Sequence, residues 1–212
     1  MTPARTTTAR AWWAVLSAVV AGSLLLDAPA FAARHAGEAG GAALAVRYLS
    51  YFTVQSNLLV LAASLPLARD PGHDGRVWRA VRLASLLGIT VTGVVFAVVL
   101  APLYRPAGVA WWTNLGLHYA APLLALGGWA IFGPWGRTGG GTVVPALGWA
   151  ALWTAWTLAH GAVTGWYPYA FLDAGAVGYP VALRNVAFVV GGAVGLLLVL
   201  RAVDRRLARA GP

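Results

Sequence analysis

Six long, nearly uncharged apolar runs constrain the fold of this chain more than any other feature of its sequence. The runs lie near residues 11–31, 46–67, 80–102, 112–133, 142–163 and 181–201. Each is about as long as the roughly 20 residues that a helix needs to cross the hydrocarbon core of a bilayer. They lack the alternation that is typical of membrane barrels. We therefore expect an all-α, polytopic membrane protein, with a single domain over residues 1–212 that forms a bundle of six transmembrane helices.

The overall composition favours the same interpretation over a soluble helical protein with a large core. Only 10% of the residues are charged and 59% are hydrophobic. A soluble domain contains about 25% charged residues, so most of the surface of this protein would be unsuited to water. The length of the apolar runs also argues against the soluble alternative.

The distribution of arginine predicts the orientation of the chain in the membrane. The net charge of +9 comes from arginine alone, because the sequence contains no lysine. Such a charge can indicate nucleic-acid binding, but these arginines lie between apolar runs, and we predict no nucleic-acid partner. With the N-terminus in the cytoplasm, eleven arginines fall on the cytoplasmic side and four outside, as the positive-inside rule requires. We expect both termini in the cytoplasm, and the Arg-, Ala- and Gly-rich composition suggests a bacterial cytoplasmic membrane.

The first apolar run has an alternative interpretation as a signal peptide. Arg5 and Arg10 precede it, and Ala30-Phe31-Ala32 resembles a small-residue cleavage site. The run is longer than the apolar core of a usual signal peptide, and Asp27 and Pro29 directly precede the cleavage point. We therefore expect an uncleaved first span.

The absence of cysteine limits the chemistry of the chain. It excludes disulfides, thiolate metal sites and cysteine nucleophiles. We predict no metal site and no cofactor. A lesser alternative is haem ligation by His118 and His160, which fall in different runs in the same leaflet. An absorbance scan after haem supplementation would test it through the Soret band.

Polar side chains are costly inside a bilayer, and here they gather in three groups. At helical spacing, Ser50, Thr53 and Asn57 would share one face of the second span. In the fourth span, Asn114 and His118 lie one turn apart. The fifth span ends near His160 and is followed by an aromatic segment that contains Trp166 and Tyr169. With the predicted topology, all three groups lie near the outer face, where they would form one site if their helices are neighbours.

Three blocks of sequence resemble the androgen-induced family of six-span membrane hydrolases and its bacterial relatives. The blocks are Arg47-Tyr48-Leu49-Ser50-Tyr51; Asn114, Gly116 and His118 followed by Pro122; and Val163-Thr164-Gly165 through Phe171-Leu172-Asp173. Together with the number of spans, the resemblance covers most of the chain. The third block is its most distinctive part.

The resemblance implies hydrolysis of fatty acid esters of hydroxy fatty acids by a threonine nucleophile and a histidine. His118 matches the histidine position of the family. Ser50 matches the threonine position, which is a departure from the family pattern, and Thr53 one turn deeper is the alternative nucleophile. A hydroxyl nucleophile needs a base within hydrogen-bond reach, and histidine is suited to that role near neutral pH.

The functional hypothesis is a membrane-embedded hydrolase of lipid-like esters, with membrane lipids and a lipid-like substrate as its partners. Ser50 or Thr53 would be the nucleophile and His118 the base, forming a dyad without a carboxylate. Asn57 and Asn114 would orient the histidine or stabilise an oxyanion. The remaining candidates for substrate binding are His160, Trp166 and Tyr169. The alternative is a non-enzymatic membrane protein that binds or carries a lipid or small solute, or serves as an assembly partner, with the same polar groups holding a ligand or joining helices.

Overall fold

The computed structural model describes residues 2–210, which form helices and connecting segments without any β-strand. The elements are α1 (Pro3–Arg34), α2 (Gly41–Ser50), α3 (Phe52–Arg69), α4 (Arg76–Val95), η1 (Phe96–Leu100), α5 (Val109–Leu115), η2 (Gly116–Ala120), α6 (Ala121–Phe132), α7 (Gly140–Thr164), η3 (Ala170–Leu172), α8 (Ala174–Val177) and α9 (Tyr179–Ala210). Here η1 and η2 are π-helical turns, and η3 is a short 3₁₀ helix. The all-helical prediction is confirmed.

All six apolar runs of the sequence form helices. Five helical segments are long and apolar enough to cross a membrane: α1, α4 with η1, α5 through α6, α7 and α9. The remaining run, which is the second in the chain, forms the pair α2 and α3, which meet at an angle of 73°. Residues 2–210 therefore contain five candidate spans, or six if the bent pair is one span.

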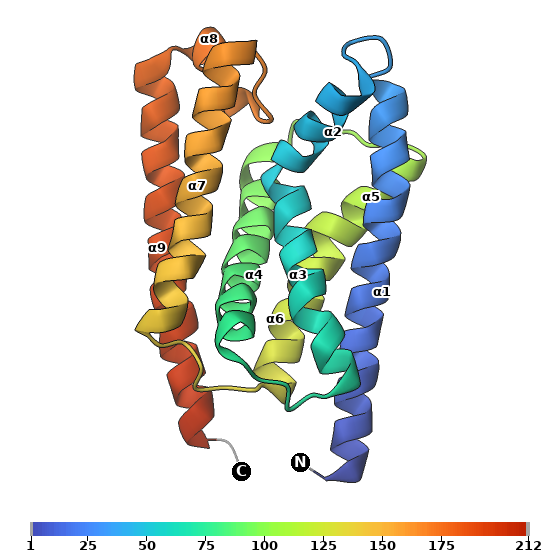
Figure 1. The fold of residues 1–212 in the computed structure, drawn as a ribbon, viewed down its shortest axis with the longest axis vertical. Helices are drawn as coiled ribbons and strands as arrows, with labels where there is room; N and C mark the ends of the chain where they lie inside the picture. Colours follow the sequence, from blue (N-terminus) through green and yellow to red (C-terminus); the bar gives the residue numbers. More distant parts are fainter. Residues whose placement is uncertain (1, 211–212) are drawn as a thin grey trace.

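The helices run roughly parallel or antiparallel, and both ends of the described chain lie at the same end of the bundle (Figure 1). We call this the terminal end, and the opposite end, which holds α8 and the α1–α2 loop, the distal end. At its start, α1 is capped by Thr2, whose hydroxyl accepts a hydrogen bond from the backbone N–H of Arg5 at 3.4 Å. Gly165, with φ +69°, ends α7 in the left-handed conformation that favours glycine.

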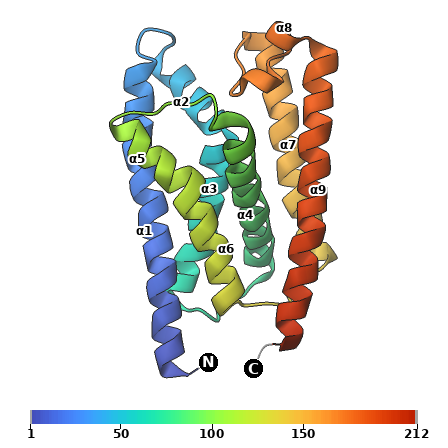
Figure 2. The same ribbon diagram turned by 180° about the vertical axis from the view of Figure 1, so that it is seen from behind.

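The best packed part of the molecule consists of α1, α3, α4, α5 and α6 (Figure 2). Its core contains fully buried side chains from several of these helices, among them Leu16, Val20, Val54, Ile89 and Leu117. Two hydroxyls also meet inside this region, where Ser17 and Ser64 lie 2.8 Å apart and join α1 to α3. We call this group of five helices the packed half.

The remaining two long helices, α7 and α9, lie beside α4 (Figures 1 and 2). α9 is anchored near each end, where Ala182 on one side and Leu197, Leu200 and Asp204 on the other are buried. No residue between Ala182 and Leu197 is buried among the residues described. The middle of α9 therefore packs only loosely on the packed half, through half-buried residues such as Val189 and Ala193.

The second apolar run differs from the continuous helix that the sequence predicts. The chain becomes extended at Tyr51 (φ −68°, ψ 128°), and α3 then starts in a new direction. The break frees carbonyl groups at the end of α2, and side chains satisfy them. Gln55 Nε2 donates to the Leu49 carbonyl at 2.9 Å, and Trp153 Nε1 donates to the Ser50 carbonyl at 2.9 Å.

The bend also corrects the prediction that Ser50 shares one helical face with Thr53 and Asn57. Ser50 ends α2, whereas Thr53 and Asn57 lie on α3. The rule that residues three or four apart share a face applies only within one continuous helix. Thr53 and Asn57 therefore share a face of α3, whereas Ser50 is directed separately.

Candidate functional site

A threonine, a histidine and a tyrosine from three distant parts of the chain meet at the distal half of the molecule. Thr53 Oγ1 lies 3.2 Å from His118 Nε2 and 3.4 Å from the hydroxyl oxygen of Tyr169. The backbone N–H of Thr53 also donates to the Tyr169 hydroxyl at 3.4 Å. The group joins α3, η2 and the segment that follows α7, and we call it the Thr–His–Tyr cluster.

The first turn of α3 places Thr53 in this cluster. Because the chain bends at Tyr51, Thr53 is the second residue of a new helix, and its backbone N–H has no partner inside that helix. That N–H instead donates a hydrogen bond to the Tyr169 hydroxyl oxygen. The bend thus determines which hydroxyl of the second run meets the histidine.

The imidazole of His118 is held by an aromatic partner and a π-helical turn. Its ring stacks on Phe96 with centroids 4.1 Å apart and an interplanar angle of 29°. His118 lies in η2, and Phe96 begins η1, so both stacked rings belong to π-helical turns. Such turns are rare and often occur at functional sites. Within residues 2–210, His118 Nδ1 has no hydrogen-bond partner, and the cluster is a dyad rather than a triad.

Burial further favours the protonated form of Tyr169, the third member of the cluster. Tyr169 lies in the connecting segment between α7 and α9, and burial of its hydroxyl raises its pKa above the ordinary value for a tyrosine. The hydroxyl therefore keeps its proton at neutral pH and can donate a hydrogen bond. Its oxygen accepts from the Thr53 N–H, and its proton can be donated to Thr53 Oγ1 or to a bound ligand.

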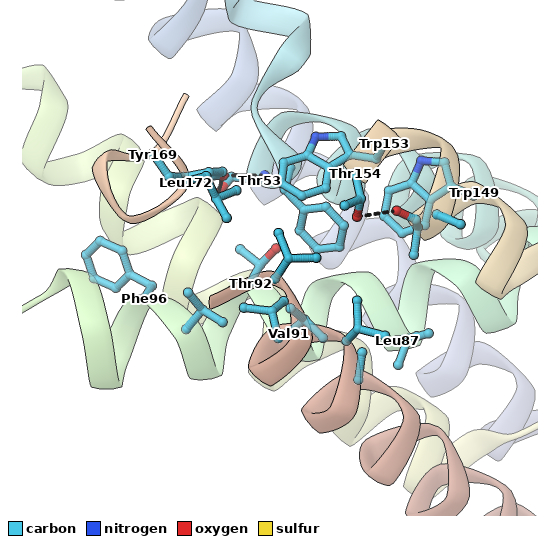
Figure 3. A pocket seen from close by; sticks show the side chains of 18 of the residues that line it. Thr53, Leu87, Val91, Thr92, Phe96, Trp149, Trp153, Thr154, Tyr169 and Leu172 are labelled. Atoms are coloured by element: carbon cyan, nitrogen blue, oxygen red, sulfur yellow. Dashed lines mark hydrogen bonds between the residues drawn. The ribbon is translucent and has the colours of Figure 1, made fainter. Parts of the chain in front are cut away.

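The cluster borders one end of an apolar cavity of about 260 Å³ between α3, α4, α7 and α9 (Figure 3). Phe96 and Tyr169 lie at one side of the cavity, and Leu87 and Trp149 lie at the other. Apart from the cluster, its lining is mostly aliphatic and aromatic. Pockets of this character, with a few convergent polar groups, are typical of small-molecule sites.

The hydroxyl of Ser50 is occupied elsewhere. It donates to the Val46 carbonyl at 2.7 Å and accepts from Trp156 Nε1 at 2.9 Å. The Ser50 side chain does not line the cavity or contact His118 through a hydrogen bond. Of the two hydroxyls considered as nucleophiles, the structure brings Thr53 to the histidine.

The two asparagines take different positions around the cluster. Asn57 is fully buried on α3, and its Nδ2 donates to the Thr53 carbonyl at 2.8 Å and to the Leu117 carbonyl at 3.3 Å. It therefore connects the helix of Thr53 to the residue before His118. Asn114 instead lines a separate pocket at the distal end, together with Arg105 and Trp111.

His160 and Trp166 form an aromatic group next to the cluster. The His160 ring packs on Trp156, with centroids 5.2 Å apart, and meets the edge of Trp166 at 5.8 Å. Trp166 also contacts Tyr51 at 5.8 Å, and the Arg47 guanidinium lies over its ring at 5.4 Å. These contacts hold the segment after α7 against α2, and neither residue lines the cavity.

Sequence reasoning missed two residues that shape the site, Phe96 and Trp149. Both are apolar aromatics in apolar runs, and nothing in their sequence context distinguishes them from ordinary core residues. Gln55 gave a weak signal in the sequence, because a glutamine inside a membrane needs a hydrogen-bond partner. In the structure that partner is Trp149.

The fold and the site together define an all-helical protein with five or six candidate membrane spans and a threonine–histidine pair beside an apolar cavity. Comparison of the chain with models of protein families, with curated proteins and with solved structures finds no match.

Proposed function

We propose that this chain is a six-span membrane protein of the bacterial cytoplasmic membrane, with both termini in the cytoplasm. The arginines favour this orientation, since eleven of fifteen lie in the segments at the terminal end. In this orientation the bent pair α2–α3 counts as one span. The Thr–His–Tyr cluster then lies in the outer half of the membrane.

We further propose that the protein hydrolyses lipid-like esters. The observation that carries this proposal is the distance of 3.2 Å between Thr53 Oγ1 and His118 Nε2 at the polar end of an apolar cavity. A hydroxyl becomes a nucleophile when a base within hydrogen-bond reach accepts its proton. The resemblance to the androgen-induced family supports a hydroxyl nucleophile paired with a histidine. It matches Ser50 to the nucleophile position, and the contact with His118 supports Thr53 in that role instead.

The reaction would proceed in two steps, acylation of Thr53 and hydrolysis of the resulting threonine ester. Thr53 Oγ1 attacks the ester carbonyl carbon while His118 Nε2 accepts the hydroxyl proton, and the tetrahedral intermediate then expels the alcohol, which takes that proton. Water next attacks the threonine ester with His118 again as base, which releases the acid and restores the Thr53 hydroxyl. The protonated Tyr169 hydroxyl is positioned to donate to the oxyanion of both intermediates.

A non-enzymatic lipid-binding or carrier protein is the second candidate. The mostly apolar lining of the cavity favours it, because such a cavity can hold a lipid chain without any reaction. In this case the Thr–His–Tyr cluster would only bind the polar part of the ligand. The two candidates differ in whether Thr53 is an activated nucleophile.

The test is labelling of the purified, detergent-solubilised protein with a fluorophosphonate, together with hydrolysis of a fluorogenic fatty acyl ester. We expect Thr53→Ala and His118→Ala to lower both signals by at least about 100-fold, which is the usual contribution of a general base. Thr53→Ser should retain part of the activity, because it keeps the hydroxyl.

Ser50→Ala is the matched control, because it removes a neighbouring hydroxyl that is bonded to Val46 and Trp156. It should leave labelling within a few-fold of wild type. Labelling that survives in Thr53→Ala would contradict the proposed nucleophile. A folded wild type that reacts with neither reagent, while a control membrane hydrolase does, would favour the lipid-binding candidate.

A further inference from the structure

The cavity extends from the Thr–His–Tyr cluster toward the terminal end of the molecule. On α4 and η1 its lining runs from Phe96, which stacks on His118, to Leu87, which is roughly 14 Å at the usual rise of about 1.5 Å per residue. On α9 the lining continues from Val186 to Val194. The space is therefore elongated along the helices, with the Thr–His–Tyr cluster at its distal end.

The indole of Trp149 lies at the far end of this space, on the same side as Leu87, and is held from three sides. Its Nε1 donates to Gln55 Oε1 at 3.0 Å, and its ring stacks on Phe52 with centroids 4.9 Å apart. On the third side it lies against Gly88 of α4, where an added Cβ would be 2.8 Å from Trp149 Cη2. A ring fixed in this way does not move aside easily. Trp149 thus forms a rigid floor opposite Phe96 and Tyr169 (Figure 3).

The side of the cavity that α9 forms is open to the surroundings. Val190 and Val194 line the cavity, yet 47% and 40% of their surfaces are exposed. This is the part of α9 in which no residue between Ala182 and Leu197 is buried. In a bilayer, the hydrocarbon chains of lipids would surround these exposed valines.

From these features we infer that the cavity binds one unbranched acyl chain, which reaches it sideways from the bilayer past α9, and that Trp149 limits the length of that chain. An elongated apolar space with polar groups at one end fits an amphipathic molecule with a single hydrocarbon chain. The inference rests on the proposed function for the placement of the ester carbonyl beside Thr53. The chain then points away from the cluster toward Trp149.

The experiment measures binding rather than turnover, on the full-length protein in detergent micelles. Saturated fatty acids of increasing length displace a fluorescent fatty acid, and each gives a Kd that refers to the free aqueous concentration of the fatty acid, after correction for its partition into protein-free micelles. In wild type, each added methylene should tighten binding about fourfold, from a burial free energy of about 0.8 kcal/mol, until the chain reaches Trp149. Beyond that length the gain should stop.

Trp149→Ala should move this limit to longer chains by removing the floor. Trp156→Ala is the matched control, because it removes another α7 tryptophan whose indole N–H also donates to α2–α3, but which does not line the cavity. It should leave the limit unchanged. Ala150→Phe adds bulk to the cavity wall and should move the limit to shorter chains. This second change keeps the test decisive if Trp149→Ala does not fold.

The outcomes separate this inference from the proposed hydrolysis. A length limit that persists in Thr53→Ala and shifts in the cavity variants supports the acyl-chain site even if no ester is hydrolysed. Conversely, ester hydrolysis by a protein whose limit is the same in wild type, Trp149→Ala and Ala150→Phe would overturn the inference and leave the proposed function intact. Failure of the folded wild type to bind any of the fatty acids would also overturn the inference.

Discussion

α4 and α9 are both long, apolar helices, yet the rest of the protein covers them very differently. In the most apolar 18-residue window of each helical segment, 56% of the residues of α4 with η1 are buried, against 11% for α9. α4 packs against α3, α6 and α7, whereas α9 is held mainly near its two ends. Similar hydropathy therefore serves two structural roles, a central helix and a peripheral one.

The difference separates the parts of the candidate site by rigidity. Thr53 and His118 are carried by elements that contact the packed half, and Asn57 connects those elements directly through the Leu117 carbonyl. Groups that must meet within a few tenths of an ångström need such support. The cavity instead depends on α9, where packing is sparse and local opening costs less free energy. Such a site can keep Thr53 and His118 in contact while the α9 side of the cavity opens to let an acyl chain enter.

The largest expected effect concerns the anchor that holds α9 at the terminal end. Asp204 is 2% exposed and accepts hydrogen bonds from Trp129 Nε1 at 3.3 Å, the Arg137 N–H at 3.0 Å and the Thr138 hydroxyl at 2.9 Å. Asp204→Ala would leave the buried Trp129 indole N–H without a partner and would remove the acceptor of the half-buried Arg137 and Thr138 donors. We expect a loss of about 3 kcal/mol in the free energy of unfolding, measured by chemical denaturation in detergent micelles.

Because α9 is held mainly near its ends, the loss of stability in Asp204→Ala should be greatest in and around α9. Hydrogen exchange should rise in α9 and in the α6–α7 connection before it rises in α1 or α3. Arg205→Ala, an exposed neighbour on the same helix, serves as the control and should change little. Uniform loss of protection throughout the protein would show that α9 is as firmly integrated as α4.

The second prediction compares the same substitution in the two regions. A Cβ at Gly128 of α6 would lie 2.6 Å from Trp12 Nε1 and 2.7 Å from Trp13 Cη2, whereas a Cβ at Gly192 of α9 meets no atom within 4 Å in the part of the chain described. Gly128→Ala should cost about 2 kcal/mol through overpacking. Gly192→Ala should be neutral or slightly stabilising, because alanine favours helix. Thermal unfolding of the two variants side by side would measure this, and equal melting temperatures would contradict it.

The same contrast explains how much of the molecule could be predicted from sequence. Hydropathy located all six helical runs, because a long apolar helix is recognised from its own residues. The bend at Tyr51 was missed, since no proline or glycine marks it. It depends on a hydrogen bond from Trp153, 103 positions away in the chain, to the Ser50 carbonyl. Local patterns carry no information about such a partner.

The candidate site was predictable to a similar degree. Its polar residues were found because serine, threonine, asparagine and histidine are conspicuous in apolar runs. The choice between Ser50 and Thr53 was left open, as it follows from the bend. The cavity could not be foreseen, because Phe96 and Trp149 look like core residues and only the position of α9 leaves space between them.

The smallest expected effect lies in the connections at the terminal end that join the two regions. Asp74, before α4, contacts Arg79 Nε at 2.6 Å and Arg137 of the α6–α7 connection at 2.8 Å. The Arg79 guanidinium holds the pKa of the Asp74 carboxyl well below its usual range. A carboxyl whose pKa is lower in the folded state stabilises that state above its unfolded pKa, and the stabilisation is lost as the pH falls.

Asp74→Asn should therefore lower the melting temperature slightly at neutral pH, by about 1 °C, because exposed ion pairs contribute little. The difference from wild type should shrink as the pH falls below about 4, where the unfolded aspartate becomes protonated. It should also shrink in high salt, which screens exposed charges. Melting curves of both proteins across this pH range would measure the effect. A difference that grows toward acid pH would mean that Asp74 does not join the two regions through its charge.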